Sequence, residues 1–473
     1  MSEFVTIQVG QCGNQIGGAF WPQILKEYNV SIHQKPEKRT VSQSVSYNSL
    51  SSFFNLTNLS LRKSTECMPL YELLNNQVKA RAVCIDMEDS VVSRFRTGPL
   101  KGLFDERCLL TNYPGSGNNW AEGFCEHGPN YKAKILKVLR HVVERCDSLH
   151  GFLMLFSTGG GTGSGLGTYV LNLLTDNYPK IERFVSCVYS TGTEDVITCP
   201  YNNALATYQL LQNATCVFPV ENRCLLNIVS QKCRNNFYTK TDISSLFKPF
   251  EDMNNIIVEM LLHLTSGSRF PGSLNFDMNE INTNMVPFPQ MHFLSAGFNH
   301  LNNSCATGLR KSSKQIKENN FLAACNRSNQ MIKVEPLGSK SILLASTIIG
   351  RGDYTLTDLQ SYTEKLQAKG KFTPWSRKCV KAGLCSVAPK NQSSALFSLF
   401  NTTGMYSLFE NIYGQYNKLY RKKAHIYHYQ KIDNFDSELF TECQESLLNV
   451  IQKYKELEQL VPVCIPRLKP LIE

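Results

Sequence analysis

The first half of the chain alternates short apolar runs with apolar residues at helical spacing. Residues 4–9 have the β-branched content of a strand, and Ile16, Phe20, Ile24 and Leu25 follow at the spacing of one helix face. Similar strands are expected at 80–86, 151–156 and 183–190, the last two followed by helices over 165–174 and 203–211. This alternation predicts an α/β fold, with a mainly parallel sheet covered by helices on both faces.

The pattern changes beyond residue 221, which predicts further structural units. Residues 222–233 carry apolar side chains at 224, 225, 228 and 229, the stripe of a helix that could join two units. A helical stripe over 253–264 and strands at 291–295 and 341–349 then predict an α/β or α+β unit. Two amphipathic stripes over 408–419 and 439–454 predict a C-terminal helical hairpin. The expected domains are 1–221, 222–400 and 401–473.

Residues 42–60 interrupt the pattern. They contain seven serines and show no charge run or period. Such a stretch is typical of a long, mobile surface loop.

Composition narrows the class of protein. The 473 residues are 42% hydrophobic and 19% charged, which predicts folded domains rather than disorder. The 17 cysteines include no CxxC pair and suit reduced cytosolic thiols. No secretory leader is evident, and the apolar runs fall short of the ~20 residues that cross a bilayer. The net charge of +10 is too small to identify a partner. We therefore expect a cytoplasmic protein that binds neither membrane nor nucleic acid.

The segment 152–174 carries the strongest chemical signal. An apolar run leads into five glycines among residues 159–165, and an apolar helical stripe follows. Such glycines let backbone N–H groups converge on a phosphate, while the following helix presents its positive dipole end. The residues fit neither the kinase-type phosphate loop nor the GxGxxG dinucleotide fingerprint. The interpretation is a phosphate site of another type; a tight turn without a ligand is the alternative.

Two further motifs follow expected strands and are expected at the same edge of the sheet. GQCGNQIG begins at Gly10, and its Gln11, Asn14 and Gln15 can donate hydrogen bonds to phosphate or sugar. Asp86 and Glu88 share a face at strand spacing and could hold Mg²⁺ through water. A plain turn and a solvated acidic pair are the respective alternatives.

These motifs, taken in order, resemble the tubulin family. The resemblance rests on GQCGNQIG at 10, RAVCIDME at 81, SGNNWAEG at 116, GGGTGSG at 159, RFPGSLNFDMNE at 269, VPFP at 286 and YRKKAH at 420, which span nearly the whole chain. The SGNNW start, EDVITCPYN at 194 and an end without an acidic tail are most similar to epsilon-tubulin. The resemblance implies a GTP-binding domain, a core helix, an α/β intermediate domain and a C-terminal helical hairpin.

The resemblance also implies a site for GTP or GDP with Mg²⁺. By match to the family, the phosphate loop consists of Gly160, Gly161, Thr162 and Gly163, with Ser157 near the phosphates and Asn118 at the γ-phosphate. Phosphate and base are contacted by Gln11, Cys12 and Gln15, the ribose by Asp195, and the guanine by Asn222, Phe250 and Asn254. Asp86 and Glu88 match the residues that bind Mg²⁺ and the γ-phosphate. Cys199 stands where many members place a ribose-binding glutamate.

Glu280 matches the residue that in alpha-tubulin positions water for hydrolysis of the neighbouring subunit's GTP. A carboxylate over a terminal phosphate can orient and deprotonate the attacking water. The hypothesis is that Glu280 acts in trans and that Asp277 helps to hold its loop; a surface salt bridge is the alternative.

Two functions remain open at this point. The first, implied by the resemblance, is a cytoskeletal GTP-binding tubulin of the epsilon type at the centriole, centrosome or basal body of ciliated cells, where it forms or stabilises triplet microtubules. Its implied partners are delta-tubulin, alpha- and beta-tubulin, and centriolar adaptor proteins. The second is a non-hydrolysing pseudo-GTPase adaptor that recruits centriolar partners.

Overall fold

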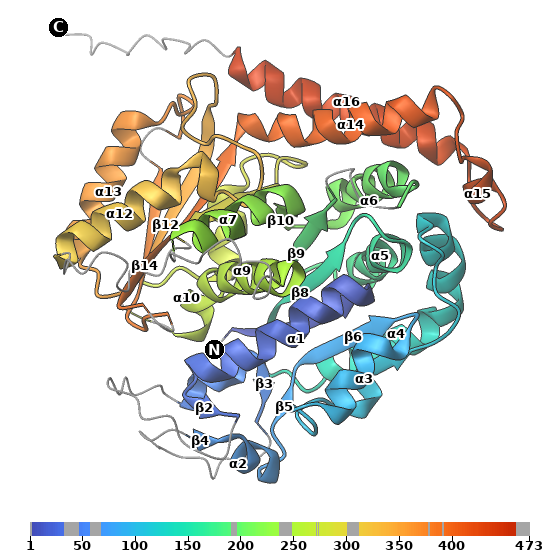
Figure 1. The fold of residues 1–473 in the computed structure, drawn as a ribbon, viewed down its shortest axis with the longest axis horizontal. Coiled ribbons are helices and arrows are strands. Elements are labelled where there is room, and N and C mark those ends of the chain that lie inside the picture. Colours follow the sequence, from blue (N-terminus) through green and yellow to red (C-terminus); the bar gives the residue numbers. More distant parts are fainter. Residues whose placement is uncertain are drawn as a thin grey trace, which may run out of the picture.

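The computed structural model describes residues 2–32, 47–56, 68–190, 196–235, 248–270, 272, 274–299, 312–376, 379–389 and 392–459. The first unit is built on a six-stranded, wholly parallel sheet in the order β10-β9-β8-β1-β6-β7 (Figure 1). Its strands are β1 (Glu3–Val9), β6 (Ala82–Asp86), β7 (Leu109–Thr111), β8 (Leu149–Ser157), β9 (Glu182–Tyr189) and β10 (Cys216–Glu221).

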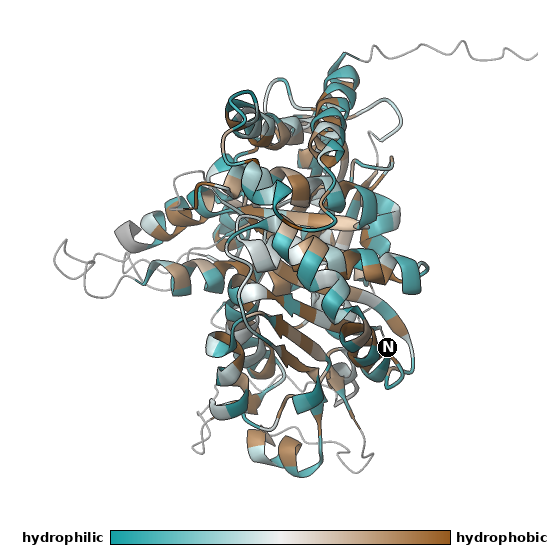
Figure 2. Ribbon diagram, turned by 90° about the vertical axis from the view of Figure 1, so that its right-hand side faces the viewer, coloured by the Kyte–Doolittle hydropathy of each residue, from teal (hydrophilic) through white to brown (hydrophobic). Residues whose placement is uncertain are grey.

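Strand β8 is apolar on both faces because each face packs against its own core. In β8, Leu153 and Leu155 belong to one core, whereas Phe152, Met154 and Phe156 belong to the other. Side chains of successive residues point to opposite faces of a sheet, so a continuous apolar run supplies both cores. Figure 2 shows the resulting concentration of hydrophobic residues in the interior strands.

Helices α1, α3 and α9 contribute to the first core, and helices α4, α5 and α6 to the second. The second core also receives α14 and α16, an antiparallel pair that packs on α6 (Figure 1). The helices concerned are α1 (Gly10–Glu27), α3 (Asp89–Thr97), α4 (Gly128–Val143), α5 (Gly167–Asn177), α6 (Cys199–Asn213), α7 (Asn222–Asn235), α9 (Pro249–Leu264), α14 (Tyr406–Tyr420), α15 (Tyr427–Gln430) and α16 (Glu438–Glu458).

The second unit is a four-stranded mixed sheet in the order β11-β14-β12-β13. Helices α12 and α13 cover its outer face, and α9 contacts β11 and β14 from the other side. The elements are β11 (Ser295–Phe298), β12 (Leu343–Gly352), β13 (Val380–Cys385), β14 (Ser394–Thr402), α10 (Ser266–Arg269), α11 (Met278–Met285), α12 (Ser313–Cys325) and α13 (Leu356–Lys369).

Smaller elements complete the described chain. They are the paired strands β2 (Val30–Ser31) and β4 (Met68–Pro69), the paired strands β3 (Phe54–Asn55) and β5 (Lys79–Ala80), helix α2 (Leu70–Asn75), the 3₁₀ turns η1 (Tyr47–Ser52), η2 (Glu106–Cys108), η5 (Arg327–Asn329) and η6 (Thr403–Met405), and the π-helical turns η3 (Glu122–His127) and η4 (Thr162–Leu166). No helix within these ranges is both long and apolar enough to cross a membrane.

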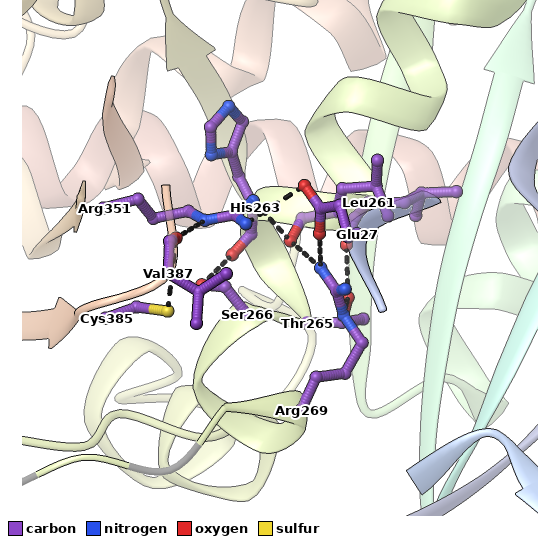
Figure 3. A network of polar contacts seen from close by, with 10 residues as sticks. Glu27, Leu261, His263, Thr265, Ser266, Arg269, Arg351, Cys385 and Val387 are labelled. Atoms are coloured by element: carbon purple, nitrogen blue, oxygen red, sulfur yellow. Dashed lines mark hydrogen bonds and ion pairs between the residues drawn. The ribbon is translucent and has the colours of Figure 1, made fainter. Parts of the chain in front are cut away.

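A buried ionic network joins the two units where α1 ends (Figure 3). The carboxylate of Glu27 forms ion pairs with two arginines, Arg269 of α10 at 2.7 Å and Arg351 of β12 at 3.0 Å. Both guanidinium groups also donate to the carbonyl of Leu262, at 2.6 and 3.2 Å. Both arginine side chains are fully buried, so this carboxylate is their principal charge partner.

The predicted α/β fold class is confirmed, including the parallel sheet, the second α/β unit and the C-terminal helical hairpin. The helix expected from residue 222 is α7. The helix that packs against both α1 and the second sheet is α9, which is largely buried from Ile256 to Leu264. The core helix implied by the resemblance is therefore α9 rather than the stripe at 222–233.

Two local predictions were wrong. Residues 47–56 are not a surface loop, because Leu50, Phe53 and Phe54 are buried in the first core and the hydroxyl of Ser52 donates to the carbonyl of Ser268 at 3.0 Å. The surrounding serines hid the apolar residues Leu50, Phe53 and Phe54 from the sequence analysis. Positions 42–46 and 57–60 of the predicted loop lie outside the described residues. The strand expected at 291–295 begins only at Ser295, since Phe293 makes an isolated bridge to Val217 instead.

We predict that Glu27→Gln lowers the free energy of unfolding by about 3–5 kcal/mol, because it leaves two buried guanidinium groups without a counter-charge. Urea denaturation monitored by circular dichroism measures the effect. The matched control is Glu410→Gln, which breaks the exposed ion pair with Lys455 and should cost less than ~1 kcal/mol. Equal losses in the two variants would contradict the role given to the buried network.

Candidate functional site

The motif-bearing loops meet at one edge of the first sheet. Strands β8, β1 and β6 are adjacent and parallel, so their carboxyl ends lie side by side. The glycine run follows β8, GQCGNQIG follows β1, and Asp86 is the last residue of β6. Open parallel sheets bind ligands at this edge.

Close backbone contacts explain part of the glycine content. Gly10 has φ +73°, and a Cβ there would lie 3.0 Å from the amide nitrogen of Gly163. A Cβ on Gly161 would lie 2.7 Å from the amide of Asn119. At Gly160 the nearest atom would be Oδ1 of Asn118, at 3.9 Å. Packing therefore requires glycine at 10 and 161, whereas the missing side chain at Gly160 leaves open space.

That open space belongs to a cavity of about 350 Å³ between α1, the glycine loop, α6, α7 and α9. Eight predicted site residues line it: Gln11, Cys12, Gln15, Ser157, Gly160, Asn222, Phe250 and Asn254. Gly159 of the predicted glycine run also lines it, and the sequence reasoning missed Val188, Ser190, Val196, Leu225, Met253 and Ile257. Ser190 directly follows β9 at the same sheet edge, a position that could have identified it.

The lining combines two kinds of chemistry. Helices α7 and α9 contribute the carboxamides of Asn222 and Asn254 and the ring of Phe250, which is 68% exposed. Ser157, the glycine loop and the first turns of α1 also line it. Amides beside an open aromatic ring can read and stack on a flat heterocycle, and a glycine loop can approach an anion.

The sugar-facing position implied for Cys199 is occupied by a buried thiol at the start of α6. The Cys199 thiol contacts the hydroxyl of Ser190, and Asn203 donates to that hydroxyl at 2.9 Å. No carboxylate among the described residues lines the cavity. Asp195, the other predicted ribose contact, lies outside the described residues.

The remaining phosphate-loop residues lie next to the cavity rather than in its lining. Thr162 begins η4, and its hydroxyl is 3.0 Å from that of Ser116. Asn118 adopts φ 54°, and its carbonyl accepts bonds from Thr198 and Asn202, each at 2.8 Å. These bonds hold Asn118 beside Gly160.

Asp86 and Glu88 form an acidic pair at the carboxyl end of β6, two strands from the glycine loop. Burial, and secondarily the nearby charge of Glu88, raise the pKa of Asp86 to about 7, although the amides of Met87 and Glu88 and the side chain of Asn14 oppose the rise. Oδ2 of Asp86 is buried without a hydrogen-bond partner in the described structure. The described ranges hold no group of three or more His, Cys, Asp or Glu side chains that could hold a metal by themselves.

Glu280 lies apart from this cavity, in the first turn of α11. Asp277 caps that helix by accepting from the amide of Glu280 at 3.1 Å, which fixes the loop that precedes it. The carboxylate of Glu280 is 2.7 Å from Nζ of Lys381, and both side chains are 40% exposed. Within the single chain, Glu280 therefore forms a surface ion pair.

Comparison with known proteins agrees with this architecture. Residues 3–230 match the model of the tubulin/FtsZ family GTPase domain, and residues 289–413 match the model of the tubulin C-terminal domain. The chain is 38% identical to the tubulin epsilon chain of Mus musculus over 98% of each chain, and 37% identical to that of Homo sapiens over 97% of this chain and 96% of the relative. A tubulin beta chain of Pyropia yezoensis is 29% identical over 97% and 93% of the two chains. The chain therefore belongs to the tubulin family of GTP-binding cytoskeletal proteins.

Proposed function

We propose that the cavity beside the glycine loop is the site of GTP and GDP, with the base at the Phe250 end and the phosphates at the Gly160 end. The observation that carries this assignment is that carboxamides with an open aromatic ring and a glycine loop line the same cavity of about 350 Å³. Carboxamides and an open aromatic ring suit guanine, whose edge offers both donors and acceptors. Asn222, Asn254 and Phe250 are the groups assigned to it.

The phosphate end would bind by backbone geometry rather than by cationic side chains. No Lys or Arg among the described residues lines the cavity. The N-terminal ends of α1 and η4, with the amides of Gly160 to Gly163, supply N–H donors and positive dipole ends. Gln11, Gln15, Asn118, Ser157 and Thr162 add polar groups without charge.

Mg²⁺ fits the acidic pair at the carboxyl end of β6. Asp86 has an unpartnered buried carboxylate oxygen and a raised pKa, so a cation nearby would favour its ionised form. Mg²⁺ is commonly held by one or two carboxylates together with substrate phosphates and water. Asp86 and Glu88 would hold the ion, and the ion would neutralise charge on the terminal phosphates.

We predict that Phe250→Ala removes the bound guanine nucleotide, because the base loses its stacking surface. The readout is chromatography of nucleotide released from the denatured protein, where wild type should yield about one GDP or GTP per chain. Phe250→Tyr is the matched control and should keep the nucleotide, since it retains the ring.

A folded wild-type protein without guanine nucleotide would contradict the assigned site. It would favour the non-hydrolysing adaptor instead, with the glycine loops retained for the close packing at Gly10 and Gly161.

Glu280 is proposed to act on the nucleotide of a neighbouring tubulin subunit. Its place in the first turn of a capped helix, 40% exposed, allows a second chain to approach the carboxylate. The ion pair with Lys381 would hold the carboxylate in place until that contact forms. In the assembled pair, Glu280 would orient water and accept its proton.

We predict that Glu280→Ala lowers GTP turnover in a reconstituted pair of subunits by about a hundredfold or more, the range expected for loss of a general base. Phosphate release measures turnover, and pelleting or light scattering reports whether the pair still forms. Glu335→Ala is the control, because it breaks an exposed ion pair with Arg327 elsewhere on the second unit. Unchanged turnover in Glu280→Ala, with the pair intact, would overturn the trans role.

The similarity to tubulin epsilon chains supports a more specific cellular role. We propose an epsilon-type tubulin of the centriole or basal body that forms or stabilises triplet microtubules, with delta-tubulin as the favoured partner and alpha- or beta-tubulin and centriolar adaptors as others. A cytoplasmic, cytoskeletal location follows from this role.

A tagged copy in dividing ciliated cells should concentrate at centrioles or basal bodies, and depletion should leave centrioles without complete triplets. Fluorescence microscopy and electron microscopy of cross-sections provide the two readouts. A diffuse signal together with intact triplets after depletion would contradict this role.

A further inference from the structure

A second, larger hollow lies at the opposite end of the first sheet from the glycine loop. Its volume is about 860 Å³. Lys79 of β5 precedes β6, and Leu109 begins β7, so the hollow faces the amino ends of strands whose carboxyl ends face the nucleotide cavity. Its lining comprises Asn55, Gln77, Lys79, Phe95, Arg96, Lys101, Gly102, Phe104, Asp105, Glu106, Arg107, Leu109 and Arg145.

The described lining is strongly cationic. It carries five Lys or Arg side chains but only two carboxylates. One of these, Asp105, already accepts from Arg145 at 3.3 Å and contacts His141 at 3.1 Å. Burial opposes ionisation of Asp105, but its bonds to the Arg107 amide and to His141 and the charge of Arg145 together lower its pKa. Of the two carboxylates in the described lining, Asp105 is therefore neutralised by neighbouring cations, which leaves Glu106 as the other acidic group.

The lining cations differ in whether they already have a partner. Lys79 donates to the carbonyl of Gly102, and Arg96 is paired with Asp89 at 2.9 Å. Lys101 and Arg107 are exposed and make no side-chain hydrogen bond or ion pair in the described part of the chain. The hollow thus keeps unneutralised positive charge at its mouth.

The rest of the surface favours an extended ligand over a compact one. The floor includes Phe95 and Phe104, buried rings with centroids 4.7 Å apart, and the carboxamides of Asn55 and Gln77 line the side. No α-helix begins among the described lining residues, so the hollow lacks the helix N-terminal amides that are typical of a phosphate site. A volume of this size suits several residues rather than one ion.

We propose that this hollow binds an acidic peptide, a glutamate- or aspartate-rich segment of another protein. Its carboxylates would pair with Lys101 and Arg107, the exposed cations that make no side-chain hydrogen bond or ion pair in the described part of the chain. The carboxamides of Asn55 and Gln77 can bond the peptide backbone, which alternates donors and acceptors. This site is independent of the nucleotide cavity and of the proposed trans role of Glu280.

The test is fluorescence anisotropy of a labelled synthetic glutamate-rich peptide titrated with the full chain at low and at high KCl. Wild type should bind, and more weakly at high salt, because these charges face solvent. The double variant Lys101→Glu/Arg107→Glu should bind at least about tenfold more weakly, equivalent to 1.4 kcal/mol. Bound nucleotide, measured on the same samples, should be unchanged, which shows that the variant is folded.

The matched control is Lys132→Glu/Lys137→Glu on the exposed face of α4, which makes the same change in net charge outside the hollow. It should bind the peptide as wild type does. If both double variants bind the peptide equally weakly, the effect is one of net charge, and the proposed binding site is wrong. Inorganic tripolyphosphate is the second probe: if it binds at Lys101 and Arg107 while the peptide does not, the acidic-peptide assignment is wrong.

Discussion

Two arginines from different parts of the chain converge on the carboxylate of Glu27, and the relative placement of the two sheets depends on this contact. Removing three charged groups from water is costly, and the cost is offset only when the groups meet at hydrogen-bond distance and share further acceptors. The carbonyl of Leu262, near the end of α9, is such an acceptor for both Arg269 and Arg351. The network therefore fixes α1, α9, α10 and β12 together and tolerates little displacement.

Helix α1 carries this constraint to the nucleotide cavity. Its first turns contribute Gln11, Cys12 and Gln15 to the cavity, and its last residue is Glu27. With 18 residues it spans about 27 Å. It packs against α9 and β8. The same helix thus contributes residues to the proposed nucleotide cavity at one end and to the junction with the second sheet at the other.

Sequence patterns predicted what is governed by local periodicity and by short motifs. Buried strands such as β8 were visible because both faces are apolar, and eight of the predicted site residues line one cavity. The interior role of Phe53 and Phe54 was hidden by surrounding serines, because burial there depends on distant segments such as α10. The pairing of Glu27 with Arg269 and Arg351 joins residues hundreds of positions apart and leaves no local signal.

The two hollows of the first sheet represent two physical ways to attract an anion. In the nucleotide cavity, backbone amides and helix ends supply directed partial charges, and the described lining contains no Lys or Arg. Such directed donors would select a ligand by shape and orientation. In the cationic hollow, whole charges sit on flexible side chains such as Lys101, so attraction is long-ranged, sensitive to ionic strength and tolerant of ligand geometry. Under the two proposals, one sheet would separate recognition by directed backbone donors at its carboxyl edge from electrostatic capture at its amino edge.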